Sequence, residues 1–172
     1  TQVHNPQTFA VEGVTAQFRR RDAASGEIQA QTTAPLLNRL PAGDALPLAA
    51  YFPPPLPPAY QVDAEILTAL PIPEDTPRYL EAQVEDLHQT IAPDGLGVTL
   101  EGHVLLAPGI TQPAQQVWVL GVAYDATGQV VGVRRWESTV PLAPGERLSF
   151  RLLVYSAGPP IARAEAWVEA RP

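Results

Sequence analysis

The sequence contains no cysteine and no methionine, and all of its 11 basic residues are arginine. The lack of cysteine excludes a disulfide framework, a thiolate metal site and a thiol nucleophile. The longest apolar run, VWVLGVAY, is far shorter than the roughly 20 residues that a membrane-spanning helix needs. Because the chain starts without methionine and without signal-peptide character, we expect it to be a piece of a longer protein.

The composition favours a folded, strand-rich protein. A net charge of −7 argues against a nucleic-acid partner, whose phosphates require basic surface. Apolar residues make up 45% of the chain, which is ordinary for a globular protein. The 20 prolines are spread along the chain, and helices tolerate interior proline badly. Strands that are joined by stiff loops accommodate this composition best.

Two segments, FRRRDAASGEIQA and VAYDATGQVVG, each have the pattern of a strand, a turn and a second strand. When Gly26 is aligned with Gly128, the later turn glycine Gly43 falls on Gly145 without a gap. After these turns, apolar residues alternate in the same phase in both copies, with the period of a half-buried strand. The chain is therefore predicted to be a tandem of one β unit.

The repeat predicts an all-β chain of two domains, residues 1–70 and 79–172, joined by a stiff proline-rich linker at 71–78. About seven strands are predicted in the second domain, at 79–89, 97–106, 116–124, 129–136, 137–141, 147–155 and 161–169. This number of short strands with regular turn signals is typical of an immunoglobulin-like β-sandwich. The Cys…Trp…Cys signature of true immunoglobulin domains is absent from the sequence.

The first domain is predicted to lack its N-terminal strand or strands. Thr1 aligns with Gly102, so residues 79–101 have no counterpart in the first domain. Such a gap leaves an open sheet edge or an uncovered apolar face, and an unpaired edge is a template for pairing with another chain. We expect a homodimer through the first domain, with upstream residues filling the gap in a longer protein.

The segments GVAYDATGQVVG and PLAPGERLSF together resemble the bacterial FxLYD-type immunoglobulin-like domains, in which a strand ending in Phe-x-Leu-Tyr-Asp precedes a turn glycine. The motif is partial in each copy. Phe18 and Asp22 are present in the first, Tyr124 and Asp125 are present in the second, and Gly121 stands where phenylalanine is expected. The resemblance implies an extracytoplasmic setting, in the cell envelope or secreted, and no catalysis.

The histidines raise the question of a metal site. If strands 79–89 and 98–106 pair across the APDGLG turn, Asp86 faces His103 and His88 faces Glu101. A cluster of carboxylates and imidazoles suits a metal ion, but cross-strand charge pairs on a solvated face are the commoner outcome. We predict neither a metal nor another cofactor.

The strongest candidates for ligand contact lie on two strands that are expected to turn tryptophan outward. Arg163, Glu165 and Trp167 alternate in RAEAWVEA, and Arg134 and Trp136 lie in GVRRWES. An exposed tryptophan with polar neighbours can stack on a sugar or anchor a protein partner. The alternative is that these rings cover a sandwich edge or the domain junction.

Catalysis has the least support in the sequence. Glu165 and Glu169 share a strand face, but four strand residues span about 13 Å, whereas the carboxylates of a glycosidase lie roughly 5–9.5 Å apart. No serine lies in a Gly-x-Ser-x-Gly setting. The sequence thus predicts a non-catalytic spacer or protein-interaction module of a larger bacterial protein. A carbohydrate- or surface-binding module and a hydrolase are the alternatives, with a protein or a polysaccharide as partner.

Overall fold

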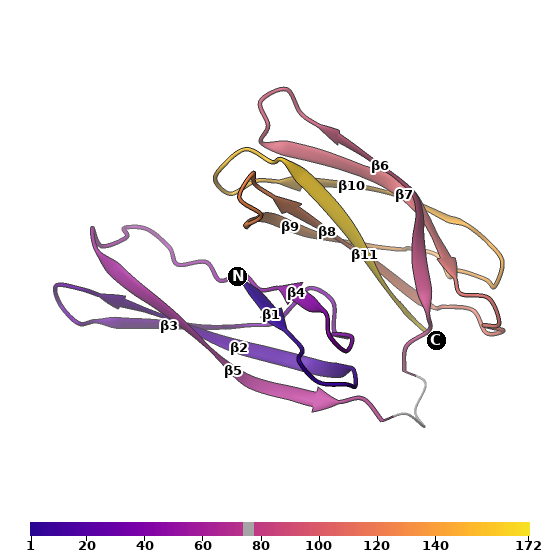
Figure 1. The fold of residues 1–172 in the computed structure, drawn as a ribbon, viewed down its shortest axis with the longest axis horizontal. Coiled ribbons are helices and arrows are strands. Elements are labelled where there is room, and N and C mark those ends of the chain that lie inside the picture. Colours follow the sequence, from indigo (N-terminus) through magenta and orange to yellow (C-terminus); the bar gives the residue numbers. More distant parts are fainter. Residues whose placement is uncertain (74–77) are drawn as a thin grey trace. The chain divides into compact units, whose positions relative to one another are not determined.

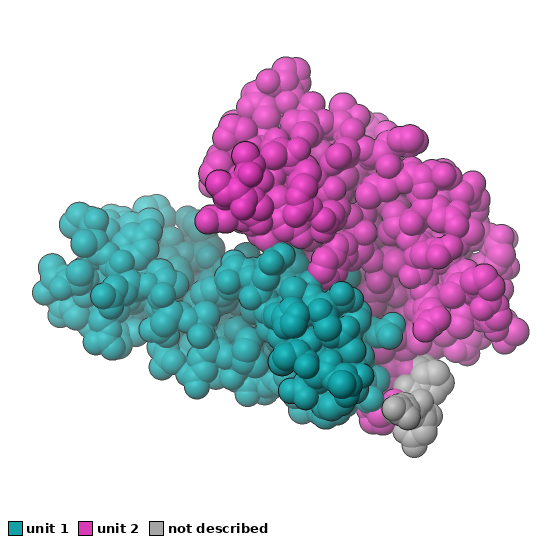
Figure 2. All heavy atoms as spheres, in the orientation of Figure 1, with its two compact units in different colours: residues 1–72 teal, residues 73–172 magenta. Residues whose placement is uncertain are grey.

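The computed structural model describes residues 1–73 and 78–172, and within them every regular element is a β-strand. The predicted all-β class is confirmed. The chain divides into two compact units, Thr1–Ile72 (unit 1) and Pro73–Pro172 (unit 2) (Figure 1; Figure 2). The predicted stiff linker falls largely on residues 74–77, outside the described residues. In the described part of the chain there is no helix long and apolar enough to cross a membrane.

Unit 1 contains five strands in two antiparallel sheets: β1 (Gln2–His4), β2 (Val11–Asp22), β3 (Ile28–Thr33), β4 (Ala45–Pro47) and β5 (Tyr60–Pro71). The short strands β1 and β4 pair with each other, and β2 is the centre of the sheet β3-β2-β5. The strand β2 buries every second residue, as its alternating sequence predicts. A small core cluster around Ala16, Phe18 and Leu48 lies between the two sheets.

Unit 2 contains six strands: β6 (Ala82–Ile91), β7 (Gly97–Leu106), β8 (Gln116–Tyr124), β9 (Val130–Glu137), β10 (Leu148–Tyr155) and β11 (Arg163–Arg171). They form the antiparallel sheets β10-β7-β6 and β11-β8-β9. The predicted strand at 137–141 is wrong. Ser138 Oγ accepts a hydrogen bond from the Val140 N–H, and Pro141 has no N–H to offer a ladder.

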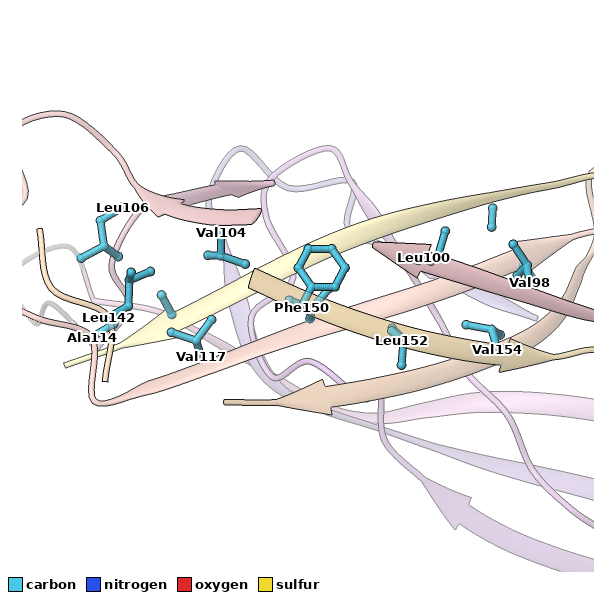
Figure 3. Packing of buried hydrophobic residues seen from close by; sticks show 14 of the residues in the cluster. Val98, Leu100, Val104, Leu106, Ala114, Val117, Leu142, Phe150, Leu152 and Val154 are labelled. Carbon is cyan, nitrogen blue, oxygen red and sulfur yellow. The ribbon is translucent and has the colours of Figure 1, made fainter. Parts of the chain in front are cut away.

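The core of unit 2 lies between its two sheets. Side chains of β7, β8 and β10 point into this space in Figure 3, with Phe150 among the aliphatic residues. Phe150 and Leu152 are buried and Arg151 between them is exposed, as the alternation in β10 predicts. Burial of this apolar surface is the main stabilising contribution to the unit.

The two units have matching strand pairings. In unit 1 Val3 pairs with Leu46, and in unit 2 Val104 pairs with Leu148. The other sheet has the corresponding pairs Phe18–Ala64 and Gly121–Ala166. These are the residues that the sequence alignment matches, so β1, β2, β3, β4 and β5 correspond to β7, β8, β9, β10 and β11.

The aspartate of the FxLYD-like motif caps a hairpin turn. Asp125 Oδ1 accepts hydrogen bonds from the N–H groups of Thr127 at 2.8 Å and Gln129 at 3.0 Å, and Gly128 has a φ of +83°. The hydrogen bond from the Thr127 side chain, followed by that from the Gln129 backbone, lowers the pKa of Asp125. Asp22 occupies the same position in unit 1. The motif therefore stabilises a hairpin turn, in which the aspartate accepts backbone hydrogen bonds and the glycine supplies the positive φ.

Candidate functional site

A polar pocket of about 640 Å³ lies on the outer face of the sheet β10-β7-β6. The strand β7 explains its position, because Leu100 and Val104 turn into the core while Glu101 and His103 point the other way. The polar side chains that line the pocket are Asp86, His88, Glu101, His103, Ser149 and Arg151. The four residues of the predicted metal cluster therefore share one pocket.

The strand register arranges the side chains of the pocket in two cross-strand rows. His88 pairs with Glu101, as predicted, and Glu101 pairs with Arg151 on the far strand. His103 lies between Glu85 and Ser149 in the neighbouring row. The prediction that Asp86 itself lies opposite His103 is wrong for the backbone pairing, in which Glu85 takes that place.

A β-bulge brings the Asp86 carboxylate to the histidine nonetheless. The ladder between β6 and β7 is interrupted between Glu85 and His88, and Asp86 has a φ of +50°. Positive φ is uncommon for a residue with a side chain, and bulges re-aim side chains. As a result, Asp86 Oδ2 lies 3.7 Å from His103 Nδ1.

Arginine side chains form ion pairs with the carboxylates of this face. Arg147 Nη2 lies 2.9 Å from Glu85 Oε2 and 2.7 Å from Asp86 Oδ2, and Arg151 Nε lies 3.3 Å from Glu101 Oε1. The hydrogen bond to Glu85 raises the pKa of Arg147 above its ordinary value. Each of these carboxylates thus has a guanidinium partner.

This arrangement is that of a cross-strand ion-pair network on a solvated sheet face. In the described residues no group of three or more His, Cys, Asp or Glu side chains is placed to hold a metal ion. Ser149 is exposed beside His103, whose buried Nδ1 has no hydrogen-bond partner among the residues that the structure describes. The pocket offers hydrogen-bonding groups to a polar ligand more readily than it offers an activated nucleophile.

The predicted tryptophan surface is divided between the two faces of the sheet β11-β8-β9. Trp136 does not face outward, since it packs against the core with its ring centroid 6.1 Å from that of Phe150. Arg134 donates a hydrogen bond to the Leu153 carbonyl at 3.1 Å. Trp167 lies opposite Leu120, on the other face of the sheet. These residues therefore do not form one ligand site.

A bulge explains why the phase of β9 was mispredicted. Val130 pairs with Tyr124 and Gly132 pairs with Ala123, so Val131 is one residue extra on its strand. One extra residue sends every later side chain to the opposite face. Counting from the turn without the bulge places Trp136 outside, whereas the structure places it inside.

The remaining candidates engage one another on the outward face. Arg163 pairs with Glu165, and its guanidinium lies 3.9 Å from the centroid of the Tyr124 ring. The Tyr124 hydroxyl donates a hydrogen bond to Glu165 Oε2 at 3.2 Å. A cation–π contact of this kind stabilises by about 0.5–1 kcal/mol where it is exposed. Arg163 and Glu165 thus have a structural role that the sequence did not reveal.

Unit 1 contains a second pocket, of about 390 Å³, which sequence reasoning did not identify as a site. Its lining is almost entirely uncharged: Val3, His4, Asn5, Pro6, Gln7, Phe9, Val11, Val14, Leu40, Ile66, Ala69 and Pro71. The pocket, which we call the unit 1 groove, lies between the segment that starts with β1 and the edge strand β5. The sequence feature that could have predicted this pocket is that residues 79–101 have no counterpart in residues 1–72.

The arginines of the run 19–21 lie in different environments. Arg19 Nε lies 3.0 Å from Asp63 on the outward face of the sheet, whereas Arg20 is only 6% exposed. Arg20 donates a hydrogen bond to Gln29 and lies over the Phe52 ring, 5.4 Å from its centroid. The stem of Arg20 therefore contributes to the core of unit 1.

Comparisons with known proteins do not assign the chain to a family. No family model matches it, and no curated protein matches it. Among solved structures it is similar to two variants of the exo-chitosanase CsxA of Amycolatopsis orientalis in complex with PNP-β-D-glucosamine. Each is 16% identical with a TM-score of 0.30, over 91% and 90% of this chain. The chain spans only 22% of the length of either enzyme.

Proposed function

We propose that this chain is a non-catalytic protein-interaction module and that unit 1 is the part that meets the partner. The observation that carries the proposal is the strand β5, which is exposed at all twelve of its residues. Val62, Ile66 and Leu70 are 52%, 47% and 58% exposed. An edge strand with exposed apolar side chains is a template for pairing with another chain, and strand addition is a common mode of peptide recognition.

The corresponding strand of unit 2 supports this reading. Val62 corresponds to Ala164, which is 9% exposed, and Ile66 corresponds to the half-buried Val168. In our proposal the two units are copies of one β unit, and only the second has its edge covered. The setting that we propose, a larger protein of the bacterial cell envelope or a secreted one, rests on the resemblance to FxLYD-type domains.

The two alternatives have less support. Sugar stacking needs a free aromatic face, but Trp136 packs on the core, and the guanidinium groups of Arg135 and Arg171 lie 4.2 Å and 4.5 Å from the Trp118 ring centroid. A hydrolase needs carboxylates free to move protons, and those of the polar pocket are paired with arginines.

A peptide-display selection tests the proposal. The full chain is immobilised and challenged with random twelve-residue peptides, and we expect enriched peptides that bind saturably. Val62→Lys or Leu70→Lys should abolish their binding, because each adds a charge to the exposed strand. Val140→Lys, at a residue 53% exposed in unit 2, is the matched control and should bind like the wild type. A selection that enriches no peptide would contradict the proposal.

A further inference from the structure

The groove in unit 1 corresponds to a part of unit 2 that is filled. Val11 forms an isolated bridge with Leu40, and Ala114 forms the same bridge with Leu142 in unit 2. Val11 and Leu40 line the unit 1 groove, whereas Ala114 and Leu142 belong to the buried core together with Leu80. Leu80 has no counterpart in residues 1–72. The unit 1 groove is therefore the place that Leu80 occupies in unit 2.

The first residues of unit 2 show how a strand fills this place. The Leu80 N–H donates a hydrogen bond to the Ala170 carbonyl at 2.9 Å, at the end of β11. Ala82 then pairs with Leu106 and Val84 pairs with Val104, so the chain passes from one sheet edge to the other. The inward residues at alternate positions are Leu80, Ala82 and Val84, that is, a large, a small and a β-branched aliphatic residue.

Unit 1 has filled the opposite end of its sandwich with its own side chains. A Cβ added at Gly121 would lie 2.7 Å from Leu152 and 3.0 Å from Leu100, so that space is already taken in unit 2. Unit 1 has the buried Phe18 at the corresponding position. Phe18 thus takes in unit 1 the space that Leu100 and Leu152 take in unit 2.

The charges around the unit 1 groove limit what can occupy it. Among its lining residues, His4 is the one ionisable side chain. The carboxylates of β5, Asp63 and Glu65, point to the other face, where Arg19 forms an ion pair with each. In the unit 2 pairing, Gln83 lies opposite Leu105, the counterpart of His4. A side chain of an occupant at that position would face His4, whose Nε2 lies 3.0 Å from the Gly43 carbonyl oxygen.

We infer that the unit 1 groove binds an extended segment of a partner protein, antiparallel to β1, with aliphatic residues at three alternate positions and a polar residue opposite His4. This inference rests on the proposed function and names its site. The backbone of the segment pairs with the free edge of β1, and its first aliphatic side chain packs against Val11 and Leu40, which line the groove. This is recognition by strand addition, in which the backbone supplies affinity and the pockets supply specificity.

The test uses a labelled peptide with the sequence of residues 79–89, titrated by fluorescence anisotropy into the full chain. We expect saturable one-to-one binding. A Leu80→Asp peptide should bind at least about tenfold more weakly, because it places a charge in an apolar pocket.

Two variants of the chain locate the binding. Ala69→Trp fills the unit 1 groove from an exposed position and should abolish binding, whereas Ala24→Trp, in an exposed turn, should leave it unchanged. Binding that survives Ala69→Trp overturns the inference. If peptides from the display selection bind the chain outside the groove, while the peptide of residues 79–89 does not bind, the inference is overturned. The proposed function is not contradicted by that result. The homodimer expected from the sequence is the competing occupant, so a chain that is dimeric alone and loses its dimer in Ala69→Trp also overturns this inference.

Discussion

Ile66 lies directly opposite Ala16 on the core-facing side of unit 1, yet Ala16 is fully buried and Ile66 is 47% exposed. Two cross-strand neighbours on one face normally share an environment. The difference arises because Ala16 lies on the central strand β2, whereas Ile66 lies on the edge strand, beyond the cover that the short strands β1 and β4 give. The energetic consequences of this difference can be measured.

Truncating Ile66 should cost far less than truncating a core residue of unit 2. We expect Phe150→Ala to lower the free energy of unfolding by about 3–5 kcal/mol, and Ile66→Ala by only about 1 kcal/mol, because half of its side chain already contacts water. All three tryptophans lie in unit 2, so urea unfolding followed by tryptophan fluorescence reports the first change. Amide exchange in β2 reports the second. Equal costs would mean that β5 is covered in solution.

The glycine at the motif position of unit 2 should be intolerant of any side chain. Gly121→Ala places a Cβ within 3.0 Å of Leu152, Val154 and Leu100. Overpacking a core of this kind costs about 1–3 kcal/mol. We expect an earlier urea midpoint by tryptophan fluorescence, while Gly158→Ala, which has open space around it, serves as control. An unchanged midpoint for Gly121→Ala would mean that the sheets separate more easily than their packing indicates.

The hairpin cap at Asp125 should make unit 2 sensitive to acid. Its pKa is lowered below the ordinary 3.8, so the folded state binds its proton less readily than the unfolded state. The stability that the ionised cap contributes is therefore present above about pH 4 and is lost as the pH falls through the folded pKa. Asp125→Asn should lower the urea midpoint at pH 7, and the difference from wild type should vanish near pH 2. If the difference in urea midpoint persists at that low pH, the contribution of Asp125 comes from its hydrogen-bond geometry rather than from its charge, which would contradict this prediction.

The polar pocket of unit 2 should not respond to zinc. Asp86 and Glu101 are each held by an arginine, so zinc would have to displace those ion pairs to gather His88 and His103. We expect no saturable heat in calorimetric titration with zinc, for wild type and for His103→Ala alike. Stoichiometric binding that disappears in His103→Ala would establish the metal cluster instead.

The sequence allowed most of the strands and their buried faces to be predicted, because alternation indicates which face is buried. The pairing of His88 with Glu101 followed from a hairpin turn and a period of two. What alternation cannot reveal is a bulge, since one extra residue reverses the phase. The extra residue Val131 turned Trp136 inward, and the bulge at Asp86 put Glu85 opposite His103.

The sequence predicted that unit 1 lacks strand material, but it did not predict where the groove lies. Aligning Thr1 with Gly102 predicted that one unit has strand material that the other lacks. The alignment could not show which space would stay open, because that depends on side-chain volume. Phe18 in place of Gly121 closes one end, and only the structure shows that nothing in residues 1–72 takes the place of Leu80.

Hydrogen exchange at single-residue resolution tests the central claim most directly. The amide groups of β1 and of residues 62–70 in β5 are followed in the full chain, with and without a saturating amount of the peptide of residues 79–89. The account predicts that protection in β1 and at the C-terminal end of β5 rises at least about tenfold with the peptide, while β7 and β11 in unit 2 are unchanged. Protection that is unchanged in β1, or already as high without peptide as in β7, would contradict an open groove that accepts a strand.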